Sequence, residues 1–220
     1  EAPDIRAVAE VISHAKADIL VLQGIDWDYE NRTLSALAEL LADAGIEYGH
    51  QFALRPNSGL ATSFDLDGDG RFGGPGDAQG FGRFTGSSGL ALLSVFPIDT
   101  ASVTDLSSLL WHEIPDARMP QDDLGNPFPS EDAQVAQRLS STGHWMVPII
   151  LSDSTIMTVM MFQAGPPVFD GSEDRNGLRN RDEIRLWSLV MDGLIGAPPT
   201  RPFVIAGGAN LDPDKGEGFR

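Results

Sequence analysis

Apolar residues recur every three or four positions in three parts of the chain, the spacing that places them on one face of an α-helix. This periodicity predicts helices over residues 4–17, 34–45 and 182–194. Asp4 is a suitable N-cap for the first helix, and Gly45 is a suitable end for the second.

Runs of consecutive apolar residues predict buried strands between these helices. The predicted strands cover residues 19–23, 47–53, 89–94, 148–151, 156–163 and 202–206. Polar residues 152–155 join two of the strands in a hairpin, and a long Gly/Asp-rich loop occupies residues 55–88. Helices that precede the early strands, with a hairpin later in the chain, favour a mixed α/β sandwich.

The chain has 220 residues, 41% of them hydrophobic, which is enough for one well-buried domain that spans residues 1–220. Its 15 basic and 32 acidic residues give a formal net charge of −17. Such a charge repels polyanions at long range, so duplex nucleic acid is an unfavourable partner. A local basic site or a bound divalent cation would still accept one phosphate group, which keeps a phosphorylated small molecule among the candidate ligands.

The sequence has no cysteine, which excludes disulfides and thiolate metal sites but does not determine the compartment. It has no run of about 18 apolar residues, so no transmembrane segment is predicted. The chain opens on Glu1-Ala2-Pro3 rather than on a basic and apolar leader. Two alternatives follow: a cytoplasmic protein, or the mature part of a longer precursor.

The last predicted strand leads directly into a turn of small and polar residues. Gly207 and Gly208 come first, and Asn210 and Asp212 follow. Polar residues at the end of a buried strand often carry the chemistry of α/β enzymes. We therefore predict that Asn210 and Asp212 are candidate catalytic residues.

Four short segments resemble, in the same order, motifs of the endonuclease/exonuclease/phosphatase superfamily, the metal-dependent phosphoesterases related to DNase I. Residues 17–26 resemble "A-D-I-l-x-L-Q-E", residues 89–98 resemble "G-x-a-i-l-S-r-f-P-I", and residues 206–213 resemble "G-D-x-N". Residues 162–177 resemble "H-x-T-P-P-V-F-D-G-x-E-D-R-N-G" of a proteobacterial subgroup. The resemblance implies a DNase I-like four-layer α/β sandwich, two packed mixed sheets flanked by helices. It also implies further strands, so the sequence is expected to be incomplete at both ends.

The sequence departs from the family pattern at three catalytic positions. Gly24 stands where the family has a metal-binding glutamate, Gln163 replaces a histidine, and Gly208 replaces an aspartate. Glycine offers no side chain, and glutamine cannot carry a charge or transfer a proton. Asn210 of the last motif is retained, whereas the family's closing "S-D-H" is absent.

Three functions are compatible with this pattern. The first is a pseudoenzyme that binds a protein partner or a phosphorylated small molecule. The second is an active phosphatase or phosphodiesterase with a rearranged site, in which Asp26 or Asp28 replaces the missing glutamate and holds Mg²⁺ or Mn²⁺. The third is a calcium-stabilised structural subunit of a larger assembly.

The glycine-rich loop contains the spacing of a calcium-binding loop. Asp65, Asp67 and Asp69 occupy alternate positions and Gly70 follows, so three carboxylates can converge on one hard cation. The closing glutamate of the full pattern is missing, because position 76 is glycine and Asp77 comes one residue late. The alternative is a solvated acidic turn. A structural Ca²⁺ would favour a periplasmic or extracellular location.

Residues 170–181 form a dense polar segment that includes Arg175 and Asn176. An arginine fork suits phosphate oxygens, so these two residues are predicted to bind phosphate. The alternative is a network of ion pairs that fixes the loop against the sheet. His144, beside Trp145, is a further phosphate-binding candidate, and packing in the core is its alternative.

Overall fold

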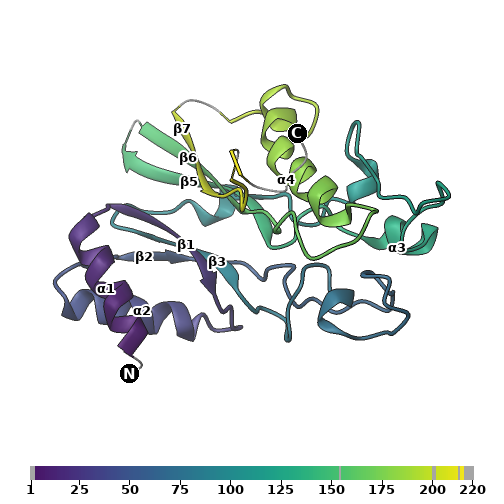
Figure 1. Ribbon diagram of the computed structural model, residues 1–220. Coiled ribbons are helices and arrows are strands. Elements are labelled where there is room, and N and C mark those ends of the chain that lie inside the picture. Colours follow the sequence, from purple (N-terminus) through teal and green to yellow (C-terminus); the bar gives the residue numbers. More distant parts are fainter. Residues whose placement is uncertain (1–2, 154, 200–201, 213, 216–220) are drawn as a thin grey trace.

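Two β-sheets pack face to face and carry helices on their outer surfaces (Figure 1). The structure, a computed structural model, describes residues 3–153, 155–199, 202–212 and 214–215. Helices α1 (Pro3–Ala15) and α2 (Arg32–Asp43) cover the first sheet, and α4 (Arg175–Met191) covers the second. This arrangement of four layers is the mixed α/β sandwich that the sequence predicts.

The first sheet has the order β1-β3-β2, and both outer strands run antiparallel to β3. Its strands are β1 (Ile19–Ile25), β2 (His50–Phe52) and β3 (Gly89–Ser94). Every residue of β3 is buried, because side chains alternate between the two faces and both faces are covered. Leu90 and Leu92 pack against the second sheet, whereas Ala91 and Leu93 pack against the helices.

The second sheet has the order β4-β5-β6-β7, with β6 and β7 parallel and the other pairs antiparallel. Its strands are β4 (Thr104–Asp105), β5 (Gly143–Ser152), β6 (Thr155–Gln163) and β7 (Phe203–Gly208). Trp145, Val147 and Met161 face the first sheet and complete the core between the sheets. On the opposite face, Met160 and Phe162 pack against α4.

Short elements complete the structure outside the sandwich. They are α3 (Glu131–Ala136) and the 3-10 helices η1 (Pro75–Asp77), η2 (Thr100–Ser102) and η3 (Trp111–Glu113). Among the described helices, none is both long and apolar enough to cross a lipid bilayer.

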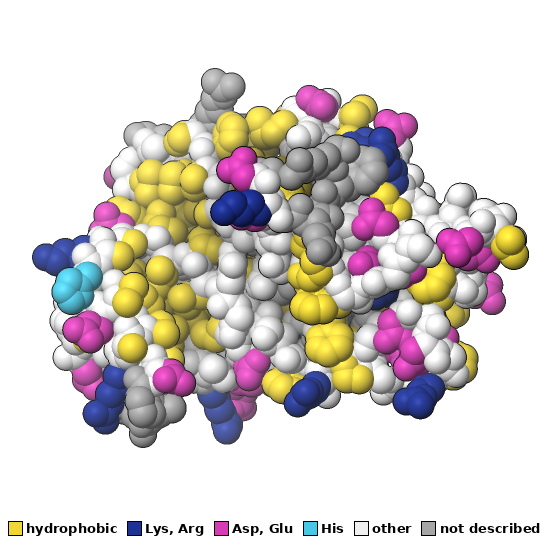
Figure 2. All heavy atoms as spheres, in the orientation of Figure 1, with side chains coloured by type: hydrophobic (Ala, Val, Ile, Leu, Met, Phe, Trp, Pro, Cys, Tyr) yellow, Lys and Arg dark blue, Asp and Glu magenta, His cyan; other side chains and the backbone are white. Residues whose placement is uncertain are grey.

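Strands β1 and β7 lie at the edges of their sheets. They approach each other at one end of the sandwich (Figure 1), and Figure 2 shows hydrophobic side chains gathered over this part of the surface. Val204 and Ile205 of β7 are 41% and 44% exposed. The side of the sandwich that holds these two edges therefore exposes apolar side chains.

The helix that covers the second sheet begins earlier than predicted, at Arg175 rather than at residue 182. The reason is that its first turns bury polar residues, among them Arg179, Asn180 and Glu183, which an apolar periodicity does not detect. Strand β5 is also longer than predicted, since it starts at Gly143 instead of residue 148. The hairpin after β5 includes Ser154, which lies outside the described residues.

Candidate functional site

The ends of three strands meet at one place in the sandwich. Gln163 and Gly208 are register partners at the ends of β6 and β7. Gln23 of β1 reaches the same place, because a Cβ atom added to Gly208 would lie 2.6 Å from its Oε1. The amide of Gln23 therefore fills the space in which a side chain at position 208 would lie.

The residues at this meeting point are neutral. Gly24 has a φ of 72° at an irregularity in the pairing of β1 with β3, a conformation that strains any other residue. The Oε1 atom of Gln163 is buried and has no hydrogen-bond partner among the described residues. Asn210 also has positive φ, at 52°, and its Nδ2 donates to the carbonyl of Ala164 at 3.3 Å.

The two carboxylates proposed to replace the missing glutamate have other partners. Asp26 accepts a hydrogen bond from the backbone N–H of Ser88 at 2.9 Å. Asp28 accepts from the backbone of Thr33 and Arg32 at the start of α2, and these bonds lower the pKa of its carboxyl. The side chains at the strand ends that are available to bind a metal ion are thus mainly amides. Mg²⁺ binding normally includes one or two carboxylates, so this set does not fit the catalytic Mg²⁺ that the family resemblance implies.

A cavity of about 600 Å³ opens beside the strand ends. It is lined by residues from the glycine-rich loop, the end of β6, the segment after it, and α4. Its polar lining residues include Asp67, Gln163, Arg175, Asn176, Glu183 and Asn210. The structure therefore brings together four residues that the sequence singles out in two motifs: Gln163, Arg175 and Asn176 from residues 162–177, and Asn210 from residues 206–213.

Arg175 connects the cavity to the acidic loop. Its Nη1 donates to the carbonyl of Leu66, which lies between two aspartates of that loop. Burial lowers the pKa of the Arg175 guanidinium, and the nearby carboxylates, first Asp67 and then Asp170, oppose this effect. Arg175 is thus a partly buried cation held by acidic groups.

Asn176 fixes the segment that precedes α4. Its backbone N–H donates to Asp170 Oδ2 at 2.5 Å, and its Nδ2 donates to the carbonyl of Val168 at 2.7 Å. The wall of the cavity formed by residues 168–170 is therefore tied to the first turn of the helix.

A buried hydrogen-bond network lies beneath the cavity, and no motif in the sequence predicts it. Glu183 accepts hydrogen bonds from Ser141 N at 2.6 Å, Ser141 Oγ at 2.7 Å and Gly165 N at 2.7 Å. Burial raises the pKa of the Glu183 carboxyl, and Arg179 opposes the rise. The sequence does contain one signal for this network. Asn176, Arg179 and Glu183 have helical spacing, which indicates a polar helix face rather than a loop.

Two predicted site residues lie elsewhere. His144 is fully buried, and its ring nitrogens contact Ser140 Oγ at 2.6 Å and the carbonyl of Glu183 at 2.9 Å. Burial lowers the pKa of His144 to about 4, so its ring is neutral at pH 7, and it lies in the core outside the lining of the cavity. Asp212 is exposed and accepts from the backbone of Asp214 and Lys215, outside the lining of the cavity.

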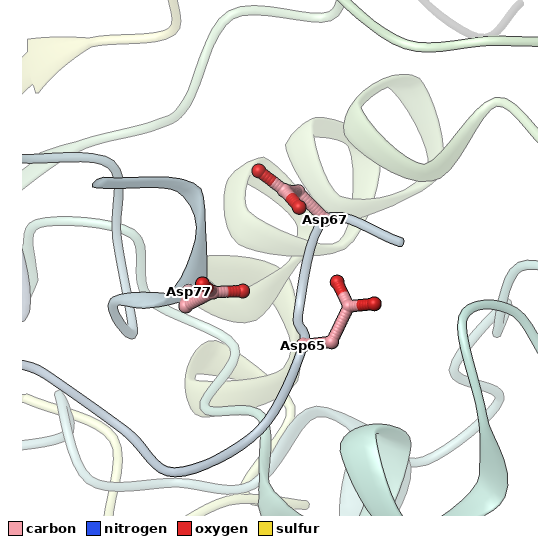
Figure 3. Close-up of side chains that lie close together, drawn as sticks. All are labelled: Asp65, Asp67 and Asp77. Carbon is pink, nitrogen blue, oxygen red and sulfur yellow. The ribbon is translucent and has the colours of Figure 1, made fainter. Parts of the chain in front are cut away.

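The acidic loop brings three carboxylates together, but not the predicted three. Oxygen atoms of Asp65, Asp67 and Asp77 lie within 4.8 Å of one another (Figure 3). Asp69 is outside this group and instead accepts from the backbone N–H of Arg71. Asp77 replaces it because η1 folds back on the loop, where Asp77 accepts from Leu66 N at 3.0 Å. This set of hard oxygen donors suits a divalent cation such as Ca²⁺.

The two packed sheets and their flanking helices define the chain as a four-layer α/β sandwich. The chain belongs to the endonuclease/exonuclease/phosphatase family, because the sequence model of that family matches residues 1–220. No curated protein matches the sequence closely enough to be reported as a relative.

Solved structures support the fold. An endonuclease/exonuclease/phosphatase from Beutenbergia cavernae DSM 12333 is 18% identical with a TM-score of 0.53, over 96% of this chain and 44% of that chain. Sphingomyelinase C from Streptomyces griseocarneus is 17% identical with a TM-score of 0.51, over 96% of this chain and 57% of that one. ANGEL2, a 2′,3′-cyclic phosphatase, is 14% identical with a TM-score of 0.50, over 95% of this chain and 44% of that one. This chain thus spans about half the length of these structures.

Proposed function

We propose that this domain binds a small phosphorylated ligand and does not hydrolyse it. The observation that carries the proposal is the occupancy of the strand ends by Gly24, Gln163 and Gly208, three residues that supply no charge. In the family pattern these positions hold a metal ligand, a histidine and an aspartate. Catalytic groups act as a unit, so their combined loss removes the metal, the base and the phosphate clamp together.

The binding part of the proposal rests on the cavity. Arg175 offers a guanidinium fork to phosphate oxygens, and Asn176 and Asn210 line the same space. Gln163 presents a buried amide oxygen that a hydroxyl of the ligand would satisfy. Such a domain would serve as a binding subunit, alone or with a protein partner.

We also propose a structural Ca²⁺ at Asp65, Asp67 and Asp77. Three carboxylates this close repel one another unless a cation neutralises them. A bound Ca²⁺ would also reduce the negative charge around Arg175, which favours an anionic ligand. Micromolar to millimolar calcium sites are most easily filled in the periplasm or outside the cell, and we propose one of these locations.

The first test is hydrolysis of bis-p-nitrophenyl phosphate and p-nitrophenyl phosphate by the full chain with Mg²⁺, Mn²⁺ and Ca²⁺ in turn. We expect no rate above that of the metal ion alone. The double variant Gln163→His with Gly208→Asp restores two missing groups, and the exposed Gln23 can turn away to make room. We expect a measurable gain in this background, and adding Asn210→Ala should abolish it.

Metal-dependent turnover by the unmodified chain would reject the proposal. If Asp26→Asn then removed that turnover, the rearranged active enzyme would be the correct interpretation. Ligand binding is tested separately by calorimetry with ribose 5-phosphate. Arg175→Gln should weaken binding at least tenfold, whereas Arg71→Gln, an exposed arginine outside the cavity, should leave it unchanged.

A further inference from the structure

Two phenylalanine rings on the wall of the cavity are presented to solvent. Phe81 is 74% exposed and Phe169 is 89% exposed, although both line the cavity. They come from different segments, the glycine-rich loop and the segment before α4. Exposing an aromatic ring forgoes the stabilisation that its burial would give, so two such rings at one cavity require an explanation.

The backbone beneath Phe81 is rigid. A Cβ atom on the preceding Gly80 would lie 1.7 Å from the carbonyl oxygen of Ser141, and one on the following Gly82 would lie 2.5 Å from the backbone nitrogen of Gly59. Gly80 is also hydrogen-bonded through both its N–H and its carbonyl, to Asn57 and Gly59. The chain is therefore packed closely on both sides of Phe81 while its ring points outward.

The backbone beneath Phe169 is also held, and it is strained. Its φ is 72°, in the left-handed region that a bulky residue rarely adopts. Asn176 fixes both neighbours, since it donates to the carbonyl of Val168 and to the carboxylate of Asp170. Strained residues persist where the surroundings hold them, and they cluster at ligand sites.

We propose that Phe81 and Phe169 are specificity-determining residues that select ligands with a planar ring. This inference rests on the proposed binding function and names its ligand class: a phosphorylated compound in which an aromatic or nucleobase ring is joined to the phosphate. The ring stacks on the phenylalanines, and the phosphate lies toward Arg175. Stacking requires rings that are already positioned, and the two rigid segments supply that condition.

Calorimetry with three probes tests the inference: adenosine 5′-monophosphate, ribose 5-phosphate and adenosine. We expect adenosine 5′-monophosphate to bind roughly tenfold or more tightly than ribose 5-phosphate. Phe81→Ala and Phe169→Ala should each weaken its binding about fivefold and leave ribose 5-phosphate unaffected. Phe72→Ala is the matched control, because Phe72 is 72% exposed in the same loop but does not line the cavity.

Equal affinities for adenosine 5′-monophosphate and ribose 5-phosphate would overturn the inference, as would no binding of either. Unchanged binding in both phenylalanine variants would overturn it as well. Adenosine that binds as tightly as its monophosphate would support ring selection and reject the phosphate part of the proposed function. The hydrolysis assay tests only whether the chain is catalytically inactive, so none of these binding results changes its interpretation.

Discussion

Buried polar residues determine how this fold responds to pH, and His144 is the main example. Its ring lies among Phe162 and Trp187, and both nitrogens have partners inside the protein. Burial depresses its pKa from 6.5 to about 4. A depressed pKa means that the unfolded chain binds the proton first, so the stabilisation is present above pH 6.5 and is lost as the pH falls toward 4.

We predict that His144 accounts for a loss of about 3 kcal/mol in the free energy of unfolding between pH 7 and pH 4. Urea denaturation at several pH values measures it. Glu183 has a raised pKa and acts in the opposite direction, so the comparison must isolate the histidine. His144→Gln should be less stable at pH 7, and its change in stability between pH 6.5 and 4 should lack the contribution of His144. An unchanged slope in this variant would contradict the prediction.

Glu183 holds two walls of the cavity together, because its carboxylate accepts from both Ser141 and Gly165. Glu183→Ala leaves three partly buried donors without their acceptor. We predict a destabilisation of roughly 3 kcal/mol or more, measured by thermal or urea unfolding. Glu39→Ala, an exposed glutamate in α2, is the control and should change stability by less than about 0.5 kcal/mol. Equal effects of the two variants would show that the network contributes little.

At the scale of elements, the apolar pattern predicts α1 and α2, because each buries one apolar face. It predicts most strands because they are runs of apolar residues between the layers. It misses the first turns of α4, where Arg179 and Glu183 occupy the buried face. The motifs predict Arg175, Asn176, Gln163 and Asn210 as site residues, and the fold places them around one cavity. The position of Arg175 beside Asp67 depends on how η1 and the glycine-rich loop fold, which residue spacing does not determine.

The same loop explains why the third carboxylate of the acidic cluster is Asp77 and not Asp69. We predict that Ca²⁺ at a hundredfold excess over its dissociation constant stabilises the domain by about 2.7 kcal/mol, which raises the melting temperature by several degrees. Asp67→Asn should remove most of this rise, because Asp67 belongs to the cluster. Asp69→Asn is the matched control and should retain it. If Asp69→Asn removed the rise as well, the regularly spaced Asp65, Asp67 and Asp69 would be the ligand set. A rise that survives Asp67→Asn would contradict the site itself.

At the scale of the whole molecule, two properties have opposite effects on self-association. The net charge of −17 keeps copies of the chain apart. The outer edge of β7 favours contact, because among the described strands it pairs only with β6, and it exposes Val204 and Ile205 on its two faces. Which property dominates depends on salt, since the screening length falls from about 30 Å at 0.01 M to about 3 Å at 1 M.

We therefore predict that the domain is monomeric in dilute buffer and self-associates as the salt concentration rises toward 1 M, as sedimentation velocity would measure. Ile205→Lys should prevent this association, because a charge on an edge strand opposes pairing with another strand. Val11→Lys is the control: Val11 is 70% exposed on the helix α1, outside both sheets, and the variant adds the same charge. If both variants suppressed association equally, net charge alone would explain it. If neither did, the contact would lie on a surface other than the edge of β7.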